Sequence, residues 1–435
     1  MTDFLDLDRR HVWHPYTQHA TEAPAIAIAR ASGASLFTPE GREILDLISS
    51  WWTTTHGHAH AGLNAALAEQ AGKVEHVMFA GFTHEPAARL AAALAERLGH
   101  GLTRVFFSDN GSTAVEVALK LAFQHWHNKG ERRHRFIAFD GGYHGDTFGA
   151  MAVGRGSGFF GAYQDLLLEV ETVPFPATWD GDTEVAAREA EALERIEKRL
   201  IAADGAVAAI IVEPLMQGAG GMRFCRPAFM SALVDLAHRL DTLVIFDEVA
   251  TGFGRTGTLF AFEQARAPDI ICLSKGLTAG YLPLAVTVMT ERIFETFLGD
   301  SFARALVHGH SFTANPLAAA VALRSLALFG EEGTLPRIAA IEDRHRQAMA
   351  RLAVHPRATR PRVLGSVLAF DLAGGSGDYK SAESVALRDH FLAIGLNIRP
   401  LGGTVYLMPP YCITDDQLER AYDGLIRGLD ALGKA

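Results

Sequence analysis

Short apolar runs alternate with longer amphipathic segments from about residue 60 to about residue 315. The runs have the length and composition of β-strands, and they are Arg104–Phe107, Arg135–Phe139, Glu169–Val173, Val207–Val212, Leu243–Phe246, Ile270–Leu273 and Leu284–Met289. Segments between them, such as Thr113–Asn128 and Glu184–Ala203, repeat their apolar residues at helical spacing. This alternation predicts an α/β fold with a mostly parallel central sheet that is covered by helices on both faces.

The pattern changes near the end of that region. An Asn-Pro pair opens an Ala- and Leu-rich helix over Asn315–Phe329, which is expected to leave the sheet domain. Farther on, Arg362–Leu372 and Leu396–Pro410 are predicted to be strands of a smaller α+β domain. The more irregular N-terminal residues are expected to pack onto this domain. The predicted organisation is an N-terminal segment (1–55), a large domain (56–325) and a C-terminal small domain (326–435).

Composition narrows the class of protein. The chain is 49% hydrophobic and 21% charged, and because its net charge is −10 without a long basic stretch, nucleic acid is not an expected partner. Three cysteines (Cys225, Cys272, Cys412) cannot form a disulfide framework and indicate a reducing compartment. No uncharged apolar stretch is long enough to span a bilayer, and the acidic N-terminus lacks a signal-peptide pattern. We therefore expect a soluble cytoplasmic protein.

Two ionisable residues stand at the ends of predicted strands. Lys275 follows the apolar run Ile270–Leu273, and Asp247 comes directly after the run Thr242–Phe246. Open α/β sheets bind ligands at the edge where the carboxyl ends of parallel strands meet. Pyridoxal phosphate (PLP) requires a lysine for its Schiff base and an acidic partner for its pyridinium nitrogen. Without a cofactor, Lys275 would be a surface charge, and Asp247 would be a helix cap or part of a buried ion pair.

A second polar turn follows the strand Arg104–Phe107. Gly111 and Ser112 stand where that strand is expected to lead into a helix, so their backbone N–H groups would face an anion such as a phosphate. Thr113 and Glu116 also fit a capping box, and capping alone would explain the polar residues. This segment by itself leaves both interpretations open.

Aromatic residues supply candidates for contacts with flat or apolar ligands. Tyr143 or His144, in a glycine-rich turn after the next strand, could stack on a ring or could simply belong to an exposed turn. Trp51 and Trp52, together with Tyr16, offer a large apolar surface with polar tips. Such a surface suits a long methylene chain or a flat heterocycle, and core packing is the alternative.

Two other motifs suggest different chemistry. Gly252–Gly257 matches the GxGxxG dinucleotide pattern, but no helix is predicted to open at Gly257, which argues against a nicotinamide-dependent dehydrogenase. The stretches His56–His60 and His308–His310 have metal-ligand character, but no nearby acidic residue completes a recognisable ligand set. We therefore expect no metal site, and elemental analysis for zinc would separate a metal hydrolase from a PLP enzyme.

The stretch Leu243–Gly257, followed by Ser274-Lys275-Gly276, closely resembles the signature of class III, fold type I, PLP-dependent aminotransferases. The resemblance extends over nearly the whole chain, and it implies amino transfer by a ping-pong mechanism with PLP as cofactor. It also implies roles in which Lys275 carries the cofactor, Asp247 contacts the pyridine nitrogen, Tyr143 stacks on the ring, and Gly111 and Ser112 hold the phosphate. The amino donor stays open, because relatives in this family use different donors.

The same resemblance implies substrate contacts and a second subunit. The substrate-binding residues would be Tyr16, Trp51, Trp52, Gly309, Arg399 and Tyr406, with Arg399 binding a carboxylate. His310 and Ser311 would reach the phosphate of the neighbouring subunit, so a homodimer is implied. Many relatives have Pro-Thr where this chain has His310-Ser311. Ser311 keeps the hydroxyl, whereas the role of His310 is open.

Overall fold

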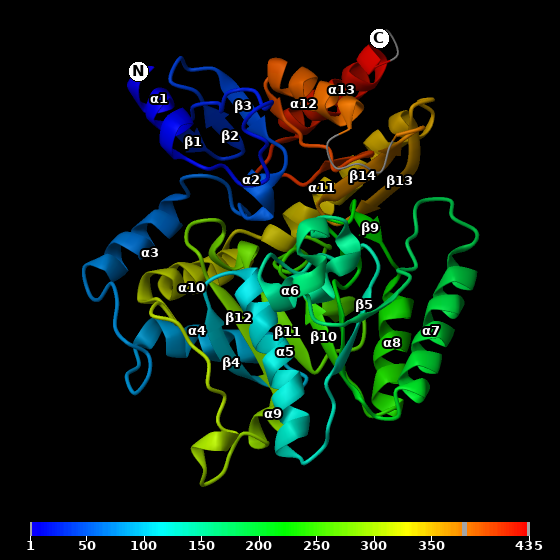
Figure 1. Ribbon diagram of the computed structural model, residues 1–435. Coiled ribbons are helices and arrows are strands. Elements are labelled where there is room, and N and C mark those ends of the chain that lie inside the picture. Colours follow the sequence, from blue (N-terminus) through cyan, green and yellow to red (C-terminus); the bar gives the residue numbers. More distant parts are fainter. Residues whose placement is uncertain (1, 376–380, 433–435) are drawn as a thin grey trace.

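The central sheet explains most of the apolar runs. The structure is a computed structural model that describes residues 2–375 and 381–432. Seven strands form the sheet in the order β4-β12-β11-β10-β7-β5-β6 (Figure 1). Their bounds are β4 Leu102–Ser108, β5 Arg135–Phe139, β6 Glu171–Val173, β7 Val207–Val212, β10 Leu243–Asp247, β11 Ile270–Leu273 and β12 Ala285–Thr290. Each predicted strand overlaps one of these, so the predicted sheet is confirmed.

Within this sheet, all neighbouring strands are parallel except where β12 pairs with β11 and β4. Every residue of β7, β10 and β11 is buried, which explains why these strands are continuous apolar runs. Successive side chains nevertheless face opposite sides of the sheet, so Val244 and Ile245 belong to different core clusters. The predicted α/β class with a mostly parallel sheet is confirmed.

Helices cover both faces of the sheet (Figure 1). On one face, α5 (Gly111–Asn128) packs its buried alanine, valine and leucine residues against the sheet. The helices that contribute to the core on the other face are α4 Glu85–Leu98, α7 Val185–Ala202, α8 Pro227–Arg239 and α10 Pro316–Glu331. Shorter or peripheral helices are α3 Ala61–Ala71, α6 Phe148–Val153 and α9 Glu291–Glu295. Because β10, β11, β7, β5 and β6 pair in parallel, their carboxyl ends lie at one edge of the sheet.

Both ends of the chain build the region above that edge (top of Figure 1). One sheet combines three N-terminal strands with one C-terminal strand, namely β1 Arg30–Ser32, β2 Ser35–Phe37, β3 Glu43–Asp46 and β15 Leu396–Asn397. A second sheet contains β13 Ala358–Leu364, β14 Val367–Leu372 and β16 Thr404–Leu407. The helices of this region are α1 Thr2–His11, α11 Thr334–Ala353, α12 Ala382–Ala393 and α13 Asp415–Leu432. Leu396 and Leu45, which are 351 positions apart in the sequence, therefore lie side by side.

Two strand predictions for this region are wrong. The segment Arg362–Leu372 contains most of a hairpin, β13 and β14, with Gly365 at its turn. Gly365 has φ +54, and a Cβ atom there would lie 2.4 Å from the carbonyl oxygen of Arg255. The segment Leu396–Pro410 contains two short strands, β15 and β16, that belong to different sheets. An apolar pattern does not show where a run turns back on itself, so the two predictions merged separate strands.

The predicted limit between the large and the small domain, at residues 325 and 326, falls inside a helix. Helix α10 runs through residues 325 and 326, so it belongs to both the large domain and the segment that follows it. We keep the division into 1–55, 56–325 and 326–435 as a proposal. Among residues 2–375 and 381–432, no helix is both long and apolar enough to cross a membrane.

Candidate active site

A cavity of about 690 Å³ lies at the carboxyl edge of the sheet. In the parallel pairing of β10 with β11, Asp247 lies opposite Cys272. Lys275 follows Cys272 by three residues, so it lies just beyond the end of β11 and near the level of Asp247. The first turn of α5 and the loop after β5 close other sides of the cavity. The predicted site residues in its wall are Trp52, Gly111, Ser112, Tyr143, Asp247 and Lys275. The topology thus brings together residues that are far apart in the sequence.

Lys275 lies in the cavity wall with its backbone in the left-handed region, at φ +43. Its Nζ atom is 4.5 Å from the centroid of the Trp52 ring. Burial lowers the pKa of Lys275 from its usual 10.5 to about 8, although the negative charges of Asp247 and Glu213 oppose the change. A substantial share of the amine is therefore neutral near pH 8, which is the form that attacks a carbonyl carbon.

Asp247 is held by a hydrogen bond that no motif in the sequence predicts. Its Oδ2 atom lies 2.7 Å from Nδ1 of His144, and its Oδ1 atom accepts the N–H of Val249 at 3.0 Å. Although burial opposes it, the hydrogen bond and charge of Asp247 raise the pKa of His144. The Nε2 atom of His144 is buried without a hydrogen-bond partner among the described residues. The sequence pointed to His144 only as a stacking residue, because no local pattern links the ends of β5 and β10.

Glu213 is a further buried carboxyl group in the cavity wall, directly after β7. Its two oxygens accept the backbone N–H groups of Tyr143 at 3.0 Å and Gly218 at 2.9 Å. Burial, assisted by the charge of Asp247 and opposed by His144, raises the pKa of Glu213 to about 7. The sequence carries a signal for Glu213, because Glu213 follows an apolar run just as Asp247 does.

Tyr143 belongs to a small hydrogen-bonded group. Its hydroxyl donates to Oδ1 of Asp146 at 3.0 Å, and the hydroxyl of Tyr16 donates to the same carboxylate at 2.8 Å. The Tyr143 ring stacks on Phe160 with a centroid distance of 6.1 Å. Burial raises the pKa of the Tyr143 hydroxyl, so this group stays protonated. These contacts fix the ring of Tyr143 at the boundary between two cavities.

The second cavity, of about 400 Å³, is lined by Tyr16, Trp51, Trp52, Tyr143 and Lys275 among others. The Tyr16 and Trp51 rings meet edge to face at 5.7 Å, and Cζ of Arg399 lies 5.4 Å from the centroid of the Trp51 ring. Because Trp52 and Lys275 line both cavities, the aromatic compartment opens onto the amine. The geometry therefore places an apolar compartment beside the reactive lysine.

Tyr406, for which the resemblance implies a contact with substrate, lies away from both cavity walls, and its substrate contact stays a prediction. It is 1% exposed and lines neither cavity in the described part of the chain. Its hydroxyl accepts the indole N–H of Trp52 at 2.9 Å. Tyr406 thus lies behind Trp52 and holds the indole in place.

The N-terminus of α5 faces the first cavity. Its N-cap is Asn110, whose side chain accepts the N–H of Thr113 at 3.0 Å, while the hydroxyl of Thr113 accepts the N–H of Asn110 at 3.2 Å. The predicted capping box of Thr113 with Glu116 is therefore wrong. Glu116 instead accepts the N–H of Gly149 at 2.7 Å. The first N–H groups of a helix have no acceptor within the helix, so those at Gly111 and Ser112 can bind an anion.

Close packing explains why position 111 is a glycine. A Cβ atom there would lie 2.6 Å from Cγ1 of Val249, in the loop that follows Asp247. The hydroxyl of Ser112 lies 2.7 Å from that of Thr147 and accepts the N–H of Thr147 at 3.0 Å. The helix N-terminus is thus pressed against the loops that carry Asp247 and Tyr143.

The remaining predicted residues do not join this cluster. Gly309, His310 and Ser311 line neither cavity among the residues that the structure describes. The histidines of the N-terminal motif are also engaged elsewhere, His58 with Asp46 at 2.8 Å and His60 with Glu332 at 3.0 Å. Within residues 2–375 and 381–432, no group of three or more potential metal ligands occurs. No helix opens at Gly257.

Comparison with known proteins agrees with this geometry. Residues 16–429 match the model of the class III aminotransferases, and the chain belongs to this family. The adenosylmethionine-8-amino-7-oxononanoate aminotransferase of Synechococcus elongatus is 49% identical over 423 residues, covering 97% of this chain and 99% of the relative. The enzyme of the same name from Geobacter sulfurreducens is 38% identical, with 98% and 96% covered.

Solved structures show the same similarity. The adenosylmethionine-8-amino-7-oxononanoate aminotransferase of Methanocaldococcus jannaschii superimposes with a TM-score of 0.92 at 31% identity and covers 99% of both chains. A PLP-bound amine transaminase from an uncultivated Pseudomonas species reaches a TM-score of 0.90 at 29% identity, with 97% of this chain and 98% of that chain covered. The predicted fold type I architecture is therefore confirmed.

Proposed function

We propose that this aminotransferase moves an amino group from S-adenosylmethionine to 8-amino-7-oxononanoate, giving 7,8-diaminononanoate in biotin biosynthesis. The observation that carries the proposal is that Lys275 and Asp247 face one cavity that opens onto an aromatic compartment. Full-length relatives that bear the name of this activity support the choice of substrates. Sequence motifs that resemble those of that enzyme are His14–Thr17, Ser49–Trp52, Gly142–Thr147, Gln217–Met222 and Tyr406–Tyr411.

Pyridoxal phosphate is the cofactor of class III aminotransferases, and the cavity fits it. A buried lysine with a lowered pKa suits the cofactor aldehyde, and the buried carboxylate of Asp247 suits a protonated pyridine nitrogen. The N-terminus of α5, with no room for a side chain at Gly111, suits a phosphate. When bound, the cofactor supplies the electron sink that makes the substrate Cα–H acidic, and it carries the amino group between the two substrates.

Each polar residue of the wall then has a separate task. The Nζ atom of Lys275 would hold the cofactor covalently and, once displaced by a substrate amine, would move a proton from the substrate Cα. Asp247 would keep the pyridine nitrogen protonated, because an ionised carboxylate at hydrogen-bond distance stabilises the cation. His144 holds that carboxylate through its Nδ1 atom. The Tyr143 ring, fixed by Asp146 and Phe160, would cover one face of the cofactor.

A homodimer would complete the phosphate site. Gly111 and Ser112 offer N–H groups from one chain, whereas Gly309, His310 and Ser311 stand away from the cavities of their own chain. We therefore propose that the partner's His310 and the partner's Ser311 approach the phosphate and that the partner's Gly309 contacts the substrate. The three free cysteines among the described residues are compatible with the cytoplasm, where we propose that the enzyme works.

The aromatic compartment would hold the body of each substrate. Tyr16, Trp51 and Trp52 supply the apolar walls that a methylene chain or an adenine ring requires. The guanidinium group of Arg399 packs on Trp51, and the described residues give it no carboxylate partner. We propose that it binds the carboxylate of a substrate. Because Trp52 and Lys275 line both cavities, both substrates would use this compartment in turn.

Single-turnover measurements with separate donors test the proposal. The holoprotein is mixed with S-adenosylmethionine, lysine or an ω-amino acid, and the near-visible absorbance of the cofactor is followed. We expect S-adenosylmethionine to discharge that absorbance and 8-amino-7-oxononanoate to restore it. If only lysine acts, the donor is wrong but the acceptor step stands; if only ω-amino acids act, the substrate class is wrong.

A further inference from the structure

Residues Ser49–Trp52, the α2 segment, have an unusual backbone. Their φ angles are +49, +44, +71 and +73, so four consecutive residues other than glycine adopt the left-handed conformation. L-residues rarely do this, because Cβ then crowds the following carbonyl oxygen. Such strain persists only where the surroundings impose it, and it is commonly found at functional sites. The segment is called the left-handed turn below.

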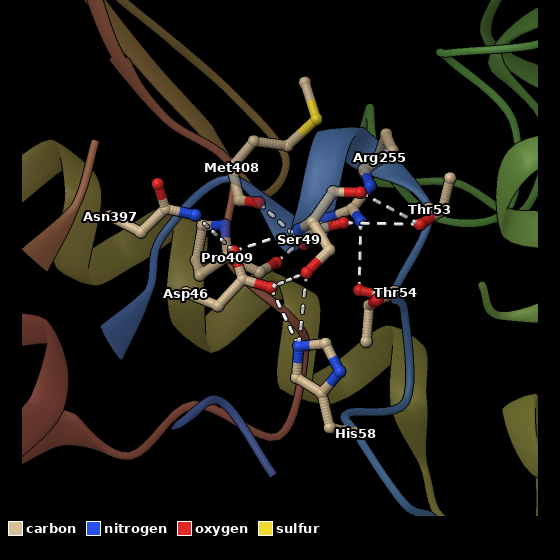
Figure 2. A network of polar contacts seen from close by, with 10 residues as sticks. Asp46, Ser49, Thr53, Thr54, His58, Arg255, Asn397, Met408 and Pro409 are labelled. Carbon is tan, nitrogen blue, oxygen red and sulfur yellow. Dashed lines mark hydrogen bonds and ion pairs between the residues drawn. The ribbon is translucent and has the colours of Figure 1, made fainter. Parts of the chain in front are cut away.

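Asp46, at the end of β3, supplies the contacts that hold this turn (Figure 2). Its Oδ1 atom accepts the backbone N–H of Ser50 at 2.9 Å, and its Oδ2 atom accepts the Ser50 hydroxyl at 2.7 Å. His58 at 2.8 Å and Asn397 at 3.2 Å contact the same carboxylate. Burial opposes ionisation, but the hydrogen bonds from His58 and Ser50 outweigh it and lower the pKa of Asp46. A buried anion therefore bridges the turn to both ends of the chain.

A second set of contacts fixes the start of the turn. The Ser49 hydroxyl donates to the carbonyl oxygen of Met408 at 2.7 Å. The buried guanidinium of Arg255 donates to the carbonyl oxygens of Pro409 at 2.8 Å and Thr54 at 3.3 Å (Figure 2). Met408 thus ties the turn to the C-terminal part of the chain, and Arg255 ties the backbone after the turn to the large domain. In the middle of the turn, Asp46 makes the two shortest contacts with Ser50, while Nε2 of His58 lies 3.5 Å from the Ser50 hydroxyl and the Thr53 hydroxyl donates to the Ser50 carbonyl oxygen at 3.3 Å.

The turn directs two indole rings to different groups. Trp52 lies 4.5 Å from the Lys275 amine, measured to the ring centroid, and is held from behind by Tyr406. Trp51 packs against Tyr16 and Arg399. In an ordinary helical or extended backbone, these neighbouring side chains would point in other directions. The left-handed conformation is therefore what presents both rings to the cavities.

We propose that Asp46 is a positioning residue for the active site, whose carboxylate holds the left-handed turn and thereby sets Trp52 against the Lys275 amine and Trp51 against Arg399. Asp46 is fully buried and lines neither cavity, so it does not touch the contents of the cavities and acts through the residues that it holds, Ser50 of the turn among them. The substrate side of this inference rests on the proposed function. The effect on Lys275 does not, because it exists in the protein without substrate.

The test compares Asp46→Asn with a matched control, Asp269→Asn. Asp269 is also a buried aspartate that contacts a histidine, His238 at 2.9 Å, and accepts a backbone N–H, that of Val244 at 2.9 Å. It lines a separate cavity away from Lys275. Both variants lose the charge of a buried carboxylate, so loss of general stability affects both. Loss of indole positioning affects only Asp46→Asn.

The first readout uses apoprotein and needs no substrate. The rate at which Lys275 captures added PLP is measured against pH. If Trp52 moves away, water reaches the amine, and we expect the midpoint to rise by about half a pH unit or more in Asp46→Asn but not in Asp269→Asn. The charged groups that face Lys275 are Asp247, Glu213 and Arg255, and all three are unchanged in both variants. An unchanged midpoint in Asp46→Asn would overturn the proposal.

The second readout uses holoenzyme and the third tests rescue. We expect Asp46→Asn to raise KM about tenfold with a smaller change in kcat, because the rings line the substrate compartment and not the cofactor phosphate. Adding Ser50→Gly removes the strain at a position with φ +44, so the double variant should recover part of the loss. Equal effects of Asp46→Asn and Asp269→Asn on melting temperature, with no separate change in KM, would show a purely structural role. If no substrate reacts even with wild-type enzyme, the proposed function fails while the pH readout still decides this inference.

Discussion

The two walls of the active site are built in different ways. The cofactor wall comes from the ends of neighbouring strands in one sheet, and its main residues, Asp247 and Lys275, are fixed by the pairing of β10 with β11. The substrate wall comes from both ends of the chain, where Trp51 and Arg399 meet although almost 350 residues separate them. The first wall follows from sheet topology alone. The second requires long-range packing and a strained backbone, so it is the more easily altered by substitution.

The largest effect should come from the centre of the cofactor wall. Lys275→Ala removes the amine that holds the cofactor and moves the proton. We expect kcat to fall by roughly 10³-fold or more, since loss of a positioned general base alone costs 10²–10⁴-fold. Borohydride reduction followed by peptide mapping should label Lys275 in the wild type. Full labelling of the alanine variant at another site would show that the lysine is misassigned.

Asp247→Asn should have the next largest effect. The amide keeps the shape of the side chain but cannot stabilise a protonated pyridine nitrogen, so proton transfer should slow by roughly 100-fold or more. Cofactor should still bind through its phosphate. The half-reaction rate and the cofactor content are measured together, with Asp269→Asn as a control for loss of a buried carboxylate. Near wild-type half-reaction rates would contradict the role of Asp247.

The main residues of the cofactor wall could be predicted because the pattern that marks them lies within short stretches of sequence. Asp247 and Lys275 each follow a continuous apolar run, and parallel strands deliver their carboxyl ends to one edge. The partners of these residues could not be found in the same way. His144 meets Asp247 across β7, which lies between β5 and β10 in the sheet order. That order depends on how helices pack, and no short pattern in the sequence encodes it.

The residues of the substrate wall predict an apolar surface by themselves, whereas their substrate roles follow from the resemblance to the family. A Trp-Trp pair predicts an apolar surface. The sequence Ser49–Trp52 does not predict four left-handed residues, because serine and tryptophan usually avoid that conformation. The strain is imposed by Asp46 and by Met408 from the other end of the chain. The same long-range origin explains why Tyr406, implied to contact substrate, lies behind Trp52.

Arg399→Lys tests the substrate wall directly. Lysine keeps the charge but loses the planar fork that binds a carboxylate with two hydrogen bonds. We expect a loss of about 1.5–3 kcal/mol in transition-state stabilisation, the range for a hydrogen bond to a charged group, with cofactor content unchanged. The measurement is kcat/KM for each half-reaction. A lowered melting temperature with unaltered kinetics would indicate that Arg399 only ties the structure together.

Gly111→Ala tests the packing of the cofactor wall. The new Cβ would lie 2.6 Å from Cγ1 of Val249, so the N-terminus of α5 must shift. Overpacking of this kind costs about 1–3 kcal/mol. We expect faster loss of PLP on dialysis and a lower melting temperature, both partly restored by adding Val249→Ala. If the second substitution restores nothing, the contact with Val249 is not the reason for the glycine.

The smallest expected effect concerns the pH at which the apoprotein captures PLP. The amine must be neutral to attack, and burial lowers the pKa of Lys275 from 10.5 to about 8, so the capture rate should rise with pH and reach half its maximum near pH 8. The direction of this pKa shift also determines how the stability of the apoprotein depends on pH. Below pH 8 the folded state bears a buried charge that the unfolded state solvates better, and this penalty disappears as pH rises from 8 towards 10.5.

A comparison with Lys275→Met isolates both effects. The methionine side chain cannot titrate. Between pH 8 and 10.5, the free energy of unfolding of the wild type should therefore increase relative to that of the variant, by at most about 1.4 kcal/mol per pH unit. The same variant should show no capture phase with a midpoint near pH 8. A wild-type midpoint close to the usual lysine value of 10.5 would mean that solvent reaches the amine freely. Trp52 would then not shield it, and the cofactor wall would be independent of the substrate wall, contrary to the coupling through the left-handed turn.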